Sequence, residues 1–191
     1  MRLDVLDRGH PLSTKALFGV IRVMSRQPVV DAVKLAFYRK DFYGAGDLTH
    51  EAMRGPSAWS VGDRELMAAV VAQANECPFC IAAHSATSGM WFGDDAKVAA
   101  TLADLDTAPI EEPLRATLRM LGKLSREQSI NADDVRDVLN AGVTPAQIED
   151  ALAVSLAFNI TTRLANAFDF TVAGPAAMAA GAKHLLKRGY R

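Results

Sequence analysis

Residues 64–84 read RELMAAVVAQANECPFCIAAH, and this stretch determines the expected fold. Helix-forming residues continue as far as Asn75, after which Cys77 and Pro78 interrupt the pattern. Proline lacks an amide hydrogen and disfavours helical geometry in the residue before it, yet it suits the first turn of a new helix. The stretch therefore predicts two helices that fold back on each other as an antiparallel hairpin over about residues 60–88.

Helical signals extend over most of the chain. Alanine, leucine, methionine and charged residues dominate, and runs of alternating β-branched residues are rare, so we expect an all-α fold. A chain of 191 residues, 50% of them hydrophobic, can build one sizeable core, and residues 1–191 are expected to form a single domain. Caps and prolines predict further helices at Thr14–Ser25, Val29–Arg39, Leu48–Arg54, Asp94 to about Leu105, Glu111–Ser125, Ala132–Asn140 and Pro175–Lys187.

The hairpin pattern recurs 84 positions later in the chain. Residues 144–170 again begin with a cap and a proline, and we expect there one helix to Phe158 and another from Ile160. In this second, degenerate hairpin Thr161, Leu164 and Phe168 stand where the first has Cys77, Cys80 and His84. The fold class that we expect is thus all-α with a duplicated antiparallel helical hairpin. Chance similarity between two alanine-rich helices is the alternative.

Charge and hydropathy exclude several classes of partner. The formal net charge of −1 offers no basic surface for nucleic acid or for an anionic membrane. The only basic cluster, Lys183–Arg191, is interpreted as a helix end with a frayed tail. No apolar run approaches the ~20 residues of a membrane span, and the first residues, MRLDVLDRGHPLS, do not resemble a signal peptide. We expect a cytoplasmic protein.

The two cysteines and one histidine form a candidate redox site. Pro78 in the first helical position puts Cys77 at the helix cap and Cys80 in the first turn, where unpaired amides and the helix dipole favour a thiolate, so both sulfurs are expected to be acidic. His84 follows Cys80 by four residues and shares its helix face. Glu65, in the first turn of the preceding helix, is the natural third member of a chain Glu65–His84–Cys80.

Other interpretations of the cysteine pair are weaker. Cys77 and Cys80 could be small buried apolar residues. Zinc would need a fourth ligand, and the remaining histidines, His10, His50 and His184, show no ligand spacing with the pair. Covalent haem attachment needs a histidine directly after the second cysteine, where Ile81 stands. We therefore expect neither a metal nor a cofactor.

A longer motif consists of Glu65, the apolar helix after it, Asn75 and the run from Cys77 to His84. This motif resembles the alkyl hydroperoxidase D (AhpD)-like branch of the carboxymuconolactone decarboxylase family. The resemblance is clear over about residues 60–88. It implies an all-helical protein that assembles as a trimer or hexamer. It also implies that Glu65, Cys77, Cys80 and His84 form the catalytic proton-relay and peroxidatic site. The decarboxylase branch lacks the cysteine pair, so lactone decarboxylation is not expected.

The resemblance also implies a mechanism. Cys80 attacks a small hydroperoxide and becomes a sulfenic acid, Cys77 resolves it to a disulfide, and an external lipoamide- or thioredoxin-like dithiol restores the thiols. The residues alone leave the order of the two sulfurs open. Some active members carry a histidine between the cysteines, where this chain has Phe79. Two rival functions are a dithiol–disulfide oxidoreductase or redox sensor, and a non-catalytic oligomeric binding protein.

Overall fold

The computed structural model describes residues 4–39 and 46–190. Residues 1–3 of the stretch MRLDVLDRGHPLS and Arg191 of the predicted tail lie outside the described residues. Over the described residues the chain forms helices and no β-strand, so the expected all-α fold is confirmed. The helices are α1 (Val5–Arg8), α2 (Leu12–Ser25), α3 (Asp31–Tyr38), α4 (Gly46–Arg54), α5 (Val61–Ala74), α6 (Pro78–Phe92), α7 (Asp95–Ala103), α8 (Glu112–Glu127), α9 (Ala132–Asn140), α10 (Pro145–Ala167) and α11 (Pro175–Arg188).

Helices α5 and α6 form the predicted hairpin. Ser60 and Asp63 close a reciprocal capping box at the start of α5, and Cys77 caps α6 with Pro78 in its first turn. Helix α6 continues one turn beyond the predicted end, to Phe92, before Gly93 stops it in the left-handed conformation. The two helices pack closely, and a Cβ atom at Gly62 would collide with the ring of Trp91.

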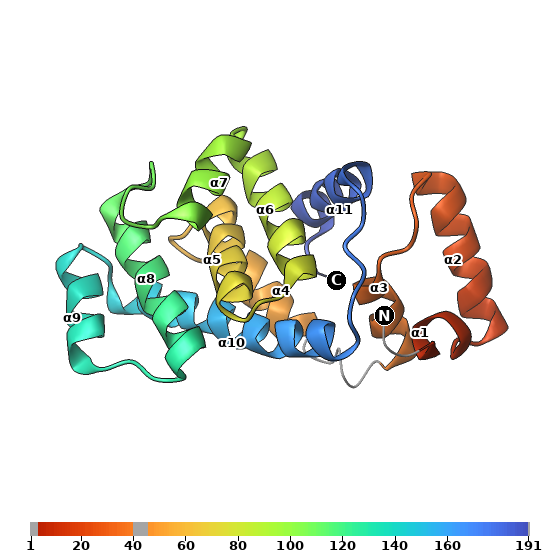
Figure 1. The fold of residues 1–191 in the computed structure, drawn as a ribbon, viewed down its shortest axis with the longest axis horizontal. Helices are drawn as coiled ribbons and strands as arrows, with labels where there is room; N and C mark the ends of the chain where they lie inside the picture. Colours follow the sequence, from red (N-terminus) through yellow and green to blue (C-terminus); the bar gives the residue numbers. More distant parts are fainter. Residues whose placement is uncertain (1–3, 40–45, 191) are drawn as a thin grey trace.

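Helix α5 is the centre of the core. Ten of its residues are buried, because α6, α7, α8, α10 and α4 all pack around it (Figure 1). Residues 66–72 of α5 are apolar on every side, and such a segment is buried on every side. Leu66 and Met67 are fully buried, and replacing either by alanine is expected to cost about 2–5 kcal/mol of stability. This packing fixes the start of α5, where Glu65 lies.

The predicted second hairpin is wrong in one respect, because α10 runs from Pro145 to Ala167 without a break. Thr162 occupies the place that Pro78 holds in the first copy, and its hydroxyl donates to the carbonyl of Phe158 at 2.6 Å. A residue that can donate its amide keeps the helix continuous, whereas proline cannot. The starts of the two helices do match the repeat. Thr144 and Gln147 form a reciprocal capping box at the start of α10, like the one at the start of α5.

The two copies meet at equivalent positions. The side-chain amide of Asn75 donates to Oδ1 of Asn159, 84 positions later, at 3.0 Å. Asn166 in turn donates to the backbone carbonyl of Asn75 at 3.0 Å. Helices α5 and α10 are therefore joined by partly buried polar contacts at the end of α5 that precedes the cysteines.

The two ends of the chain pack differently. Helix α2 has no buried residue and lies at the outer edge of the molecule, apart from the hairpin (Figure 1). Asp31 at the start of α3 accepts a hydrogen bond from the amide of Thr171 at 2.9 Å, which ties the N-terminal helices to the segment before α11. Helix α11 packs along α6 and brings the C-terminal end back to the hairpin.

Candidate active site

Glu65 and His84 meet across the hairpin. Because α5 and α6 are antiparallel, the first turn of α5 lies beside the middle of α6, and Nδ1 of His84 is 2.7 Å from Oε2 of Glu65. Both side chains are almost completely buried: the Glu65 side chain is 0% exposed and the His84 side chain is 5% exposed. The expected contact between these two residues is present.

Two further residues contact Glu65. Arg54 at the end of α4 donates from Nη2 to Oε1 of Glu65 at 2.6 Å. The hydroxyl of Tyr190, two residues beyond α11, donates to both carboxylate oxygens, at 2.9 and 3.1 Å. Sequence reasoning missed both residues, and the interpretation of the basic C-terminal segment as a frayed tail is wrong at Tyr190. No local signal identifies them, because each is distant from Glu65 along the chain and is brought to it by packing.

The environment of Glu65 keeps it ionised. Burial raises the pKa of Glu65, but the hydrogen bonds and charges of His84 and Arg54 outweigh burial and lower that pKa below its usual value. A carboxylate can only accept hydrogen bonds, so the proton between the two groups resides on Nδ1 of His84. When the imidazole carries only this proton, Nε2 is its acceptor nitrogen, which is the tautomer needed by a base or proton carrier.

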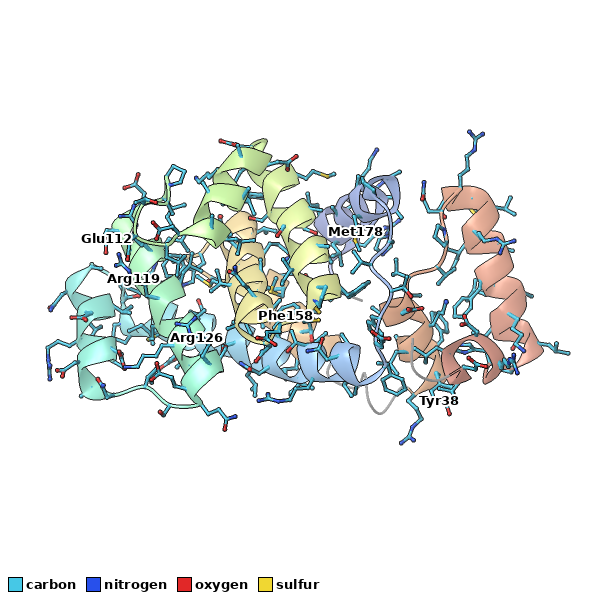
Figure 2. The ribbon with its side chains drawn as sticks, in the orientation of Figure 1. Tyr38, Glu112, Arg119, Arg126, Phe158 and Met178 are labelled. Atoms are coloured by element: carbon cyan, nitrogen blue, oxygen red, sulfur yellow. The ribbon has the colours of Figure 1, made fainter. Side chains whose placement is uncertain are left out.

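The ring of His84 contacts α10 as well as α5. The ring packs edge-on against Phe158 of α10, with centroids 4.4 Å apart. Figure 2 labels Phe158 near the centre of the molecule, among the side chains of α5, α6 and α10. Among the residues that the structure describes, no hydrogen bond joins His84 to Cys77 or to Cys80, so the expected hydrogen bond between Cys80 and His84 is not formed. The hydrogen bond to Glu65 holds Nδ1 toward α5 instead.

The two cysteines lie side by side at the start of α6. They are free thiols, both buried, and they approach each other to 3.2 Å. The Cys80 thiol donates a hydrogen bond that lowers the pKa of Cys77 to about 7; burial opposes the effect, and the backbone amides of Cys80 and Phe79 add to it. The pKa of Cys80 shifts in the opposite direction, upward.

The expectation that both sulfurs are acidic is wrong for Cys80. Its hydrogen bond to Cys77, its deeper burial and the negative charge of a Cys77 thiolate all raise the pKa of Cys80. Two thiols so close together share one negative charge, because the first thiolate opposes ionisation of the second. The first negative charge therefore resides on Cys77, at the cap of α6, where the helix dipole also favours it.

A cavity of about 440 Å³ opens beside Cys77. Its wall is part apolar, with Pro78, Phe79 and Phe170 among the lining residues. The polar part of the wall consists of two amides and two carboxylates, from Asn75, Asn166, Glu76 and Asp169. Its volume suits a small organic molecule. Cys80 does not line the cavity, so Cys77 is the sulfur that a molecule in this cavity would meet.

Phe79, which stands where some family members have a histidine, has a packing role. It is 8% exposed and makes an edge-to-face contact with Phe170, at a centroid distance of 5.2 Å. It therefore carries no proton between the cysteines and instead closes the cavity against the segment after α10.

The described residues contain neither a metal-ligand cluster nor a helix that could span a membrane. Within 4–39 and 46–190, no group of three or more histidine, cysteine, aspartate or glutamate side chains is arranged to hold a metal ion. None of the helices in these ranges is both long and apolar enough to span a membrane.

Comparison with known proteins supports the resemblance that the motif suggested. Residues 41–90, which contain α4, α5 and most of α6, match the family model described as the carboxymuconolactone decarboxylase family. The resemblance to the AhpD-like branch of this family is confirmed. No curated protein matches the chain.

Two solved structures share the AhpD-like fold over most of the chain. One is an uncharacterized peroxidase-related protein from Silicibacter sp. TM1040, with a TM-score of 0.73 and 24% identity, covering 88% of each chain. The other, described as an alkylhydroperoxidase AhpD core and an uncharacterized peroxidase-related protein, is from Ralstonia eutropha JMP134. It has a TM-score of 0.72 and 20% identity, and the match covers 91% of this chain and 92% of the other. These likenesses establish the fold.

Proposed function

We propose that this protein is a thiol-dependent peroxidase that reduces small hydroperoxides through Cys77 and Cys80. The observation that carries the proposal is the pair of free thiols 3.2 Å apart, in which Cys77 has a pKa of about 7 and lines a cavity of about 440 Å³. A thiolate is the reactive form of cysteine, and a pKa near 7 makes it abundant at neutral pH. The two structural neighbours are described as peroxidase-related, which supports the same chemistry.

In the proposed first step, the Cys77 thiolate attacks the terminal oxygen of the hydroperoxide. A sulfur–oxygen bond forms and the oxygen–oxygen bond breaks; the sulfur is oxidised and the peroxide is reduced. The leaving alkoxide takes up one proton and departs as an alcohol. The product on the protein is a Cys77 sulfenic acid.

In the second step, Cys80 attacks the sulfur of that sulfenic acid. The Cys80 thiol must lose its proton, a disulfide bond forms, and hydroxide leaves and is protonated to water. The hydrogen bond with Cys77 and burial both raise the pKa of the Cys80 thiol, so this step needs a base. Nε2 of His84, on the same face of α6 as Cys80 and held in its tautomer by Glu65, is the proposed proton acceptor.

This assignment reverses the order that the resemblance implies, in which Cys80 attacks first. Trapping of sulfenic acid with a dimedone probe tests it. In Cys80→Ser, peroxide treatment should give a labelled Cys77; in Cys77→Ser, Cys80 should remain unlabelled. Efficient labelling of Cys80 in Cys77→Ser, together with none in Cys80→Ser, would reverse the order.

The catalytic cycle needs a reductant for the disulfide. Two successive exchanges with an external dithiol return both thiols and oxidise the dithiol to its own disulfide. We propose a lipoamide- or thioredoxin-like dithiol, a cytoplasmic setting that keeps it reduced, and a homo-oligomeric enzyme, trimeric or hexameric.

Steady-state peroxide consumption with a small dithiol tests the function as a whole. The wild-type chain should consume an organic hydroperoxide, and Cys77→Ser should abolish the reaction. Rapid thiol–disulfide exchange without peroxide consumption would instead favour an oxidoreductase or sensor. Stoichiometric metal with no oxidisable thiol pair would favour a non-catalytic binding protein.

A further inference from the structure

The C-terminal segment delivers a side chain to the proposed active site. Tyr190 lies 125 residues from Glu65 in the sequence, yet its hydroxyl is 2.9 Å from Oε1 and 3.1 Å from Oε2 of that carboxylate. The same hydroxyl is 3.4 Å from Nδ1 of His84. The tyrosine ring is stacked with the ring of His84, with an angle of 20° between the planes.

The backbone around Tyr190 is fastened independently of its hydroxyl. The Tyr190 amide donates to Nδ1 of His50 at 3.2 Å, and Arg54 donates to the carbonyl of Leu185 at 3.1 Å. Gly189 adopts a positive φ of 71°, and a Cβ atom there would lie 2.7 Å from the ring of His50. Helix α4 thus holds the end of the chain over the site, so loss of the hydroxyl alone would leave the segment in place.

The arrangement of donors gives Tyr190 a distinct effect on Glu65. Arg54 bonds only to Oε1 and His84 only to Oε2, whereas the tyrosine hydroxyl contacts both oxygens. A donor shared by both oxygens opposes rotation of the carboxylate about its last bond. That rotation sets whether Oε2 faces Nδ1 of His84, and hence which nitrogen of the imidazole carries the proton.

We propose that Tyr190 is a positioning residue of the active site, which holds the Glu65 carboxylate toward His84 and thereby maintains the Nδ1-protonated tautomer of that histidine. The part of the inference that concerns turnover rests on the proposed peroxidase function. The effect of Tyr190 on the tautomer of His84 does not depend on any enzymatic activity.

The test is Tyr190→Phe in the full-length chain, which removes the hydroxyl and keeps the ring. We expect nitrogen chemical shifts of His84 to change from the Nδ1-protonated form to a mixture of tautomers. We expect the kcat for peroxide to fall by about 10-fold with little change in KM, as for loss of one hydrogen bond to a charged group.

Tyr38→Phe is the matched control, since Tyr38 is on α3 and its ring contacts His10 instead of the site. It should leave the His84 shifts and kcat unchanged. Thermal melting of both variants checks that they are folded, and Tyr190→Leu, which also removes the ring, provides a second measurement if Tyr190→Phe does not fold.

The outcomes separate this inference from the proposed function. If the wild-type chain consumes no peroxide, the proposed function fails, and the His84 shifts of folded Tyr190→Phe still decide the role of Tyr190. Unchanged His84 shifts in that variant overturn the inference, whatever the activity. In an active enzyme, a wild-type kcat for Tyr190→Phe overturns it as well.

Discussion

Oε2 of Glu65 lies 2.7 Å from Nδ1 of His84, although 19 residues separate them and neither side chain is more than 5% exposed. An ionised carboxylate in such a place is stable only while its partners are present. The hydrogen bonds from His84, Arg54 and Tyr190 meet this requirement, and they make Glu65 the most connected group of the site.

Replacing Glu65 by glutamine tests this dependence. The substitution keeps the size of the side chain but removes its charge, and the largely buried guanidinium of Arg54, 11% exposed, loses its ion pair. Removing one partner of a buried pair is strongly destabilising, so we expect Glu65→Gln to lower the free energy of unfolding by about 3 kcal/mol. Chemical denaturation measures it. Glu76→Gln, at an exposed position, is the control, and an equal effect of the two substitutions would contradict the prediction.

The pH dependence of stability follows from the pKa of Glu65. This pKa is lower in the folded state than in the unfolded chain, where it is about 4.3. The corresponding stability is therefore fully present above the unfolded pKa and is lost as the pH falls through the lower, folded pKa. Unfolding of the wild type and of Glu65→Gln, measured from pH 7 to pH 3, should show curves that converge on acidification. A constant difference would show that ionised Glu65 does not stabilise the fold.

Alkylation of the thiols tests which sulfur carries the negative charge. The rate at which iodoacetamide modifies Cys77 should rise with pH with a midpoint of about 7. In Cys80→Ala the midpoint should move upward, toward the ordinary cysteine value of about 8.5, because the thiol that donates to Cys77 is gone. Cys77→Ala is the complementary variant, in which the remaining buried thiol should react slowly. A midpoint that stays at about 7 in Cys80→Ala would show that the hydrogen bond from Cys80 is not what lowers the pKa of Cys77.

The continuity of α10 is tested at Thr162. Thr162→Pro restores the residue type that breaks the helix in the first hairpin, but here it removes a helical hydrogen bond inside a packed helix. We expect it to lower the free energy of unfolding by about 3 kcal/mol or more. Thr162→Val keeps the branched shape and loses only the hydroxyl, which donates to Phe158, so it should cost less. If both variants melt at the wild-type temperature, the helix is not continuous in solution.

The features that could be predicted from the sequence are those with short-range causes. The capping box at Ser60, proline in the first turn of α6 and the cap at Asn131 act within a few residues, and the helix Ala132–Asn140 has the predicted bounds. The pair Cys77 and Cys80 and the later His84 belong to one helix start. Their spacing identifies them as candidate site residues and indicates the resemblance to the carboxymuconolactone decarboxylase family.

Only the tertiary structure decided how these residues are connected. Arg54 and Tyr190 reach Glu65 through the packing of α4 and of the chain end after α11, and no local pattern encodes such contacts. The order of the two thiols depends on burial and on a sulfur–sulfur contact, so spacing alone made both appear acidic. Sequence therefore determined which side chains can react, because reactivity begins with residue type and helix position. Tertiary packing decided which of them is charged and which partner holds it, because burial and long-range hydrogen bonds set the pKa.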